Sequence, residues 1–322
     1  VRKMKKISLI GCLLIISTLI ALYGVNIAAG GTVTQNFDVL GTSPTATMPT
    51  DWKVDKNNTV RSVGSYSAAA SATERSAGNN MPNNATNGIY NFAAGDPTSE
   101  TDRAVGGISS KDASKSVNIY VKLTNNGSSA ISDFTISYNV EKYRNGSNSA
   151  GFTIQMYYST DGTNWTSAGD NFKTSFAADA DSNGFASAPG ATVSVSNKTL
   201  SQPLAAGSSL YLAWNYSVTD PSTTTSKAQA LGIDDVSITA NGETSNPAIT
   251  IDPASLTDFS YVDGSGPSSE KSFSLTGSNL TADLTVSISS DAHFEISATS
   301  GGTFGNSLSY TPAEGSVSAT VY

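Results

Sequence analysis

The chain has 322 residues, with 18 Lys and Arg against 26 Asp and Glu, a formal net charge of −8, one His and one Cys. This length allows about two domains with separate cores. The negative charge argues against binding to a nucleic-acid backbone, which needs clustered Lys and Arg. A single imidazole, His293, argues against Ser–His–Asp triads and multi-His metal sites, and leaves a surface or half-buried structural role as the simplest interpretation of that residue.

Residues 1–30 have the layout of a secretory signal peptide. Four basic residues within positions 2–6 precede an apolar run over residues 7–25, and small residues follow at 28–31. We therefore expect cleavage, a secreted or cell-surface location, and no membrane contact afterwards. Two alternatives remain. Residues 9–12 imitate a lipidation box ending at Cys12, although the apolar run continues well past it, and an uncleaved run of this length would serve as a membrane anchor.

Residues 31–240 are expected to form an antiparallel jelly-roll β-sandwich. Apolar residues alternate with polar ones over residues 117–123, 134–140, 152–158 and 210–218, which places side chains on opposite faces of a strand. Gly- and Asn-rich turns separate these stretches. Residues 65–96 are small, polar and barely patterned, so we expect a long loop there.

A second, smaller sandwich is expected over residues 248–322, after a linker at residues 241–247. The same alternation recurs on a smaller scale, for instance over residues 284–288 and 317–321. Tyr322 falls in the middle of an expected strand, which favours a sandwich that is truncated at its C-terminal end.

The first unit resembles a jelly-roll module of large secreted proteins from Bacteroidetes-like bacteria. The resemblance covers residues 33–240 and rests on the order of short pieces: residues 34–41 (TQNFDVLG), 103–107 (RAVGG), 136–138 with Glu141, Tyr143 and Arg144, and 232–238 (GIDDVSI). It implies a non-catalytic β-sandwich, and it carries over no catalytic residue.

The second unit resembles an Ig-like repeat of the same secreted proteins. Residues 259–262 (FSYV), 264–268 (GSGPS), 273–280 (FSLTGSNL) and 294–297 (FEIS) carry this resemblance. It implies a spacer that is followed by further modules of the same chain. Relatives of this kind often append lamin-tail-like, nuclease or phosphatase domains and a C-terminal surface-sorting domain.

Residues 179–184 (DADSNG) match the first half of a calcium-binding loop, with Asp179, Asp181 and Asn183 as ligands. The bidentate acid expected at the twelfth position is replaced by Gly190, so Asp170 or Asp220 would have to complete the site. The alternative is an ordinary polar loop with an Asn-Gly turn. A bound ion would be structural, and no other cofactor is expected.

Asp234 and Asp235 precede the last strand of the first unit, and neighbouring strand residues face opposite ways, so at most one of them points inward. Asp235 is a candidate hard-ion ligand or acceptor for sugar hydroxyls. The alternative is a carboxylate that accepts backbone N–H groups where a loop enters the strand.

Trp165 is a candidate for stacking on a sugar ring, because it follows the turn at residues 161–164. Packing across that hairpin is the competing interpretation. Trp214 alternates with Leu212 and Tyr216, which predicts a core position. The third tryptophan, Trp52, could belong to either class.

Glycoside hydrolysis would need two carboxylates at a fixed separation of about 5–10 Å. Asp133, Glu141, Asp234 and Asp235 are available, but their spacing on strands predicts no such pair. The sequence therefore favours a non-catalytic adhesion or glycan-binding protein that acts on extracellular polysaccharides or surface glycans. The alternatives are accessory domains of an extracellular hydrolase whose catalytic domain lies beyond residue 322, and a pure structural spacer.

Overall fold

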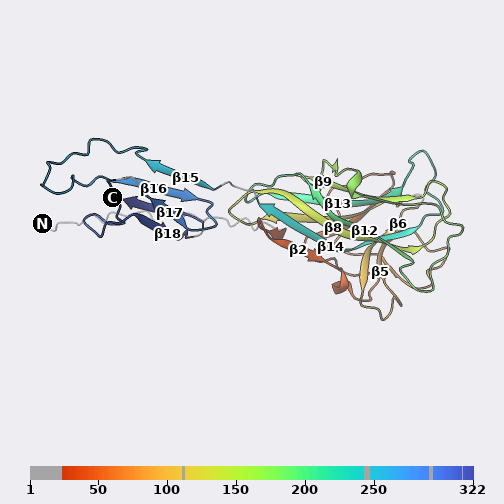
Figure 1. The fold of residues 1–322 in the computed structure, drawn as a ribbon. Helices are drawn as coiled ribbons and strands as arrows, with labels where there is room; N and C mark the ends of the chain where they lie inside the picture. The colour runs from red at the N-terminus through yellow and green to blue at the C-terminus, as the bar shows by residue number, and fades with distance from the viewer. Residues whose placement is uncertain (1–23, 111–112, 243–246, 290–292, 314) are drawn as a thin grey trace, which may run out of the picture. The chain divides into compact units, whose positions relative to one another are not determined.

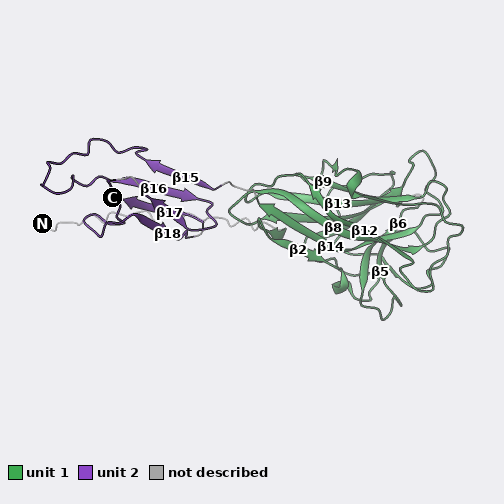
Figure 2. Cartoon of the chain, in the orientation of Figure 1, with its two compact units in different colours: residues 1–243 green, residues 244–322 purple. Residues whose placement is uncertain are grey.

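A computed structural model describes residues 24–110, 113–242, 247–289, 293–313 and 315–322, and these residues are all-β (Figure 1). The described residues contain no α-helix, only two short 3₁₀ turns, η1 (Asp38–Leu40) and η2 (Asp170–Phe172). The all-β class expected from the sequence is confirmed. The chain divides into two compact units, unit 1 (residues 1–243) and unit 2 (residues 244–322) (Figure 2).

The first sheet of unit 1 is built around the strands whose alternation is clearest in the sequence. Its main path runs β1-β7-β13-β9-β10, with β3 also paired to β7 and β11 also paired to β9. The bounds of its strands are β1 (Val25–Ile27), β3 (Trp52–Asn57), β7 (Ser116–Asn125), β9 (Phe152–Ser159), β10 (Thr166–Ser167), β11 (Lys173–Phe176) and β13 (Ser209–Val218).

The second sheet of unit 1 runs β12-β8-β14-β6-β5-β4, with β2 also paired to β14. The bounds of its strands are β2 (Thr32–Gln35), β4 (Arg75–Ala77), β5 (Gly88–Ala93), β6 (Arg103–Ile108), β8 (Ile131–Arg144), β12 (Ala191–Leu200) and β14 (Ala230–Gly242).

The core between the two sheets contains aromatic side chains from both of them. Trp214 on β13 is fully buried and stacks on Trp52 of β3, with ring centroids 5.7 Å apart. Tyr138 on β8, in the second sheet, meets the Trp214 ring edge-on, with ring centroids 5.7 Å apart. Trp214 and Trp52 are therefore core residues.

The stretch at residues 65–96 corrects the sequence-based expectation of a loop, because it contains β4 and β5. All six residues of β5, and all six of β6, are buried. A strand that is covered on both sides shows no alternation between polar and apolar residues, so the periodicity search passes over it.

Two strand pairs depart from the expected antiparallel arrangement. β1 pairs with β7 in parallel, and β4 pairs with β5 in parallel. Both are strands of three residues at the ends of their sheets, and the other pairs between named strands are antiparallel. The two large sheets of unit 1 are therefore mixed.

Strand β1 lies within the expected signal peptide, most of which, including Cys12, falls outside the described residues. Ile27 is 3% exposed and belongs to the core of unit 1. Its carbonyl accepts the Asn126 N–H at 3.2 Å, and the Gly30 N–H donates to the Ala240 carbonyl at 2.7 Å. The segment before Gly31 thus contributes contacts to the sandwich.

We expect a chain that begins at Gly31 to be about 3 kcal/mol less stable than one that begins at Gly24. The truncated chain loses the burial of Ile27, worth about 2 kcal/mol, and backbone hydrogen bonds of about 1 kcal/mol each. Urea unfolding of both chains measures the difference. Ile27→Ala should reproduce most of it, whereas Asn26→Ala, at an exposed position of the same strand, should not. Equal urea midpoints for the two chains would show that β1 does not stabilise unit 1.

Unit 2 consists of two small sheets. One runs β15-β16-β19 and the other pairs β17 with β18. Their bounds are β15 (Ala248–Asp252), β16 (Phe273–Ser278), β17 (Leu284–Ser287), β18 (Ser307–Tyr310) and β19 (Val317–Val321). The core is small and contains Leu275, Leu284, Ile296, Val317 and Val321.

A search of the described residues for a helix long and apolar enough to span a bilayer finds none.

Candidate functional site

The acidic side chains of the loop at residues 179–184 take part in hydrogen bonds with the rest of unit 1. The Lys142 ammonium donates to Asp179 Oδ1 at 2.7 Å, and Asp179 Oδ2 accepts both the Gly146 N–H and the Gln229 side-chain amide at 2.9 Å. Both oxygens of this carboxylate are therefore engaged, and its charge is balanced by Lys142.

Asp181 also accepts hydrogen bonds, from its own loop and from Asn145. Its Oδ1 accepts the Asn183 N–H at 2.9 Å and the Asn145 side-chain amide at 3.1 Å. Across the part of the chain that the structure describes, no three His, Cys, Asp or Glu side chains are placed to hold a metal ion. These contacts agree with the alternative of a polar loop, and a calcium ion at Asp179, Asp181 and Asn183 stays a prediction.

Four acidic residues gather where β14 is bulged, and we call them the carboxylate site: Asp102, Glu141, Asp234 and Asp235. The pairing of β14 with β8 shifts between Asp234 and Ser237, and Asp235 has a left-handed φ of 48°. The bulge buries Asp234, at 3% exposure, and leaves Asp235 exposed. The expectation that at most one of the two points inward agrees with this arrangement.

Burial, together with the nearby Asp235, Glu141 and Asp102 carboxylates, raises the pKa of Asp234 to about 8. Its Oδ1 is buried and has no hydrogen-bond partner among the described residues. Burial also raises the pKa of Glu141, whose carboxylate accepts the Tyr143 hydroxyl. At neutral pH, Asp234 is thus mostly protonated, which relieves the repulsion between the clustered carboxylates.

This pKa predicts that the metal-free chain loses stability as the pH rises. Asp234 titrates near pH 3.8 when unfolded and near 8 when folded, so the folded state binds the extra proton between these values. The stabilisation of the folded state by this proton is full below about pH 4 and is lost as the pH rises towards 8. We expect the free energy of unfolding to fall by about 2 kcal/mol between pH 5 and pH 8, less than an isolated group would give, because the neighbouring carboxylates titrate together.

Urea unfolding at the two pH values, with a chelator present so that no divalent cation masks the effect, measures this loss. Asp234→Asn removes the titrating group and should remove most of the pH dependence. The same slope in wild type and Asp234→Asn would contradict the assignment.

An exposed polar row extends from the carboxylate site across three neighbouring strands. The Asn139 side-chain amide on β8 donates to Asp235 Oδ2 on β14 at 3.0 Å, and the Ser194 hydroxyl on β12 donates to Asn139 Oδ1 at 2.7 Å. These three side chains hold one another in place on the sheet. No local pattern in the sequence points to Asn139 or Ser194, because the row forms only when distant strands pair.

Asp133, the remaining acid considered for hydrolysis, cannot pair with Glu141. Both lie on β8, eight residues apart, which corresponds to about 26 Å along a strand. Asp133 instead accepts the Asn241 side-chain amide. The separation is far beyond the range of about 5–10 Å that glycosidase carboxylates require.

Trp165 is half-buried and engaged with its own unit. Its indole N–H donates to the Gly64 carbonyl at 2.7 Å, and its ring lies 5.4 Å from that of Tyr120. The hairpin expected after residues 161–164 is present as the pairing of β9 with β10. The contacts agree with the packing interpretation, and sugar stacking by Trp165 stays a prediction.

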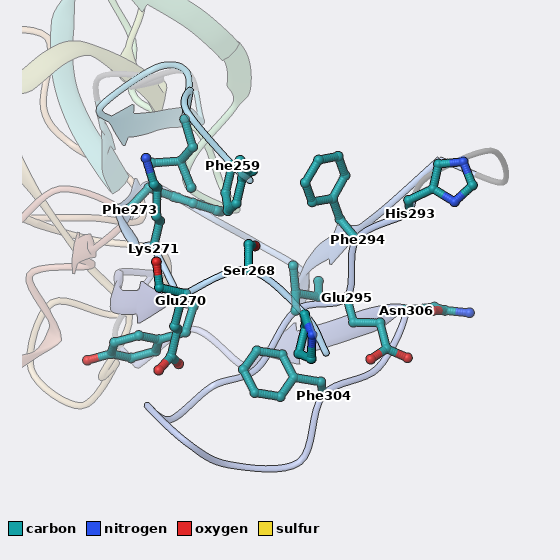
Figure 3. A pocket seen from close by; sticks show the side chains of 15 residues that line it. Phe259, Ser268, Glu270, Lys271, Phe273, His293, Phe294, Glu295, Phe304 and Asn306 are labelled. Carbon is teal, nitrogen blue, oxygen red and sulfur yellow. The ribbon is translucent and has the colours of Figure 1, made fainter. Parts of the chain in front are cut away.

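A pocket in unit 2 has a volume of about 770 Å³ and is mainly apolar (Figure 3). Phe259 and Phe294 meet at a centroid distance of 5.0 Å, and Lys271 lies over the Phe259 ring at 5.2 Å. His293 also lines this pocket and is exposed. Walls of this kind suit contact with apolar side chains better than hydrogen bonding to a sugar.

The sequence matches no protein-family model, and no curated protein matches it. Among solved structures, the chain is similar to the K1 cleaved adhesin domain of Lys-gingipain from Porphyromonas gingivalis W83, with 15% identity over 66% of this chain and 100% of that chain and a TM-score of 0.32. The K3 cleaved adhesin domain of the same protein gives 14% identity, coverages of 65% and 98%, and a TM-score of 0.28.

A third similar structure contains the CBM22-1 and GH10 modules of the N-terminal endo-1,4-β-D-xylanase 10B from Clostridium thermocellum, complexed with xylohexaose. It gives 14% identity over 70% of this chain and 30% of that chain, with a TM-score of 0.27. Identities and TM-scores this low show a distant likeness between β-rich structures and assign neither a family nor a ligand to the chain.

Proposed function

We propose that the chain is a non-catalytic extracellular protein that binds carbohydrate through unit 1, with unit 2 as a spacer. The observation that supports this most is the exposed row of Asp235, Asn139 and Ser194 beside the carboxylate site. Carboxylate, amide and hydroxyl groups fixed in this way accept and donate hydrogen bonds to sugar hydroxyls.

The electrostatics of the carboxylate site also fit binding rather than turnover. Glu141 accepts the Tyr143 hydroxyl and Asp234 is buried, so the exposed Asp235 and Asp102 are the carboxylates of this site that a ligand can reach. The cysteine-free sequence after position 12 and the net negative charge suit an exported protein.

A glycan microarray probed with residues 24–322 tests this proposal. We expect binding to at least one class of neutral glycan, reduced at least tenfold by Asp235→Ala, because the variant removes the exposed acceptor and leaves Asn139 without its partner. Asp263→Ala is a matched control, since Asp263 is an exposed carboxylate of unit 2. If Asp235→Ala binds glycans as well as the wild type does, the binding site lies elsewhere. If no glycan on the array is bound, the spacer alternative is favoured.

A further inference from the structure

A second, separate pocket of unit 1 has a volume of about 340 Å³, within the range of small-ligand sites. Two cationic side chains, Arg144 and Lys227, line it, and none of its lining residues carries a carboxylate. Asp235 does not line it, so this inference goes beyond the proposed function and does not depend on it.

Arg144 forms the buried part of the pocket. It is 3% exposed, and its guanidinium donates to the carbonyls of Ala228 at 2.5 Å and Asn83 at 3.2 Å. Its Nε–H is buried and has no partner among the described residues. The guanidinium also donates to the Pro82 carbonyl at 3.4 Å. These backbone contacts fix the guanidinium plane, and none of the three bonds supplies a negative charge.

Lys227 brings a second positive charge from the segment that enters β14. It is exposed, and its backbone has a left-handed φ of 54°. Two cations around one pocket, in a chain whose net charge is −8, create a local positive potential that attracts an anionic group. Arg binds the two oxygens of such a group with a fork of parallel N–H donors, and Lys adds a mobile charge.

Part of the pocket wall is polar, and backbone hydrogen bonds hold it in place. Asn84 and Ser182 line it, and Ser182 belongs to the loop that resembles a calcium site. That loop is tied down on both sides, because the Gly184 N–H donates to the Met81 carbonyl at 2.9 Å and the Asn145 N–H donates to the Asn183 carbonyl at 3.0 Å. The loop therefore forms a pre-organised wall, and amide and hydroxyl groups on such a wall suit a hydroxylated ligand.

We propose that this pocket binds an acidic saccharide, with the anionic oxygens of the sugar on Arg144 and Lys227 and its hydroxyls towards Asn84 and Ser182. The shared chemistry is a carboxylate or a sulfate carried by a sugar ring. Inorganic sulfate has no hydroxyls for the amide wall, and a neutral sugar has no charge for the two cations.

Isothermal titration of residues 24–322 with five probes tests the proposal: methyl glucuronide, N-acetylneuraminate, galactose 6-sulfate, methyl glucoside and inorganic sulfate. We expect at least one of the three acidic sugars to bind, at least tenfold more tightly than methyl glucoside and than inorganic sulfate. The first two probes identify a carboxylate ligand and the third a sulfated one. Lys227→Glu should weaken the binding at least tenfold, while Lys198→Glu, the same charge change on β12 outside this pocket, should leave it within twofold.

Arg144→Lys keeps the charge and loses the fork, so it should also weaken binding, and its unfolding curve shows whether unit 1 remains folded. Lys227 is exposed, so its variant stays informative if Arg144→Lys does not fold. Unchanged affinity in Lys227→Glu, equal binding of methyl glucoside, equal binding of inorganic sulfate, or no binding of any acidic sugar would overturn the proposal. Asp235→Ala should leave this affinity unchanged, which separates the pocket from the carboxylate site.

Discussion

Replacing Gly106 with Ala is expected to destabilise unit 1 by about 4 kcal/mol, which lowers its melting temperature by about 10 °C. Gly106 lies in the middle of β6 and pairs with Gly232 of β14. A methyl group at this position would lie 2.0 Å from the Leu231 carbonyl oxygen and 2.5 Å from Gly232 Cα. Both obstacles are backbone atoms in the centre of a sheet, so relief requires β6 and β14 to separate.

Thermal unfolding of Gly106→Ala and Gly242→Ala measures this effect with a matched control. Gly242 ends β14, and an added methyl group there would meet the nearest side-chain atom at an ordinary 3.5 Å. We expect Gly242→Ala, the control, to lose less than about 1 kcal/mol of folding stability. Similar melting temperatures for both variants would mean that β6 and β14 do not approach as closely as described.

Removing the Arg61 side chain is expected to cost about 3 kcal/mol. Its guanidinium donates five hydrogen bonds to β9 and β13, among them bonds to the carbonyls of Thr153 at 3.0 Å and Val218 at 2.9 Å. Hydrogen bonds from a charged donor are worth more than neutral ones, and they are not additive within one group. Arg61→Ala therefore releases the segment that lies over these strands.

The urea midpoint of Arg61→Ala, compared with those of Arg61→Lys and Arg75→Ala, tests the role of the fork. Lys at position 61 retains the charge without the planar donors and should recover only part of the loss. Arg75 donates from Nε to the Asn87 carbonyl at 3.3 Å, and we expect less than about 1 kcal/mol from its removal. Full recovery by Lys would show that charge, rather than the fork, provides the stability.

The sequence predicts strands well where apolar and polar residues alternate along the chain. β8 alternates in exposure over residues 134–140, and the neighbours Leu212 and Tyr216 correctly predict a core position for Trp214. β5 and β6 were harder to recognise, because burial on both faces removes the period that marks a strand.

The site residues were predicted less completely, because they meet only after distant strands pair. Asp235 was identified from the sequence, but its partner Asn139 is 96 residues away. The loop at residues 179–184 matched a calcium pattern, yet Lys142 from β8 neutralises Asp179. A local motif contains no information on a charge that tertiary structure brings to it. The sequence alone predicts no pocket around Arg144, because the walls of that pocket come from five separate segments of the chain.

The measurement that tests the central claim most directly is a co-sedimentation assay of residues 24–322 with insoluble extracellular polysaccharides. It follows the protein left in solution and the reducing ends released from the polymer. We expect the protein to be depleted from solution by at least one polysaccharide, while the number of reducing ends stays at the level of the protein-free control. A rise in reducing ends with time would show that the chain cleaves what it binds, and full recovery of the protein from every polymer would show that it does not bind polysaccharide.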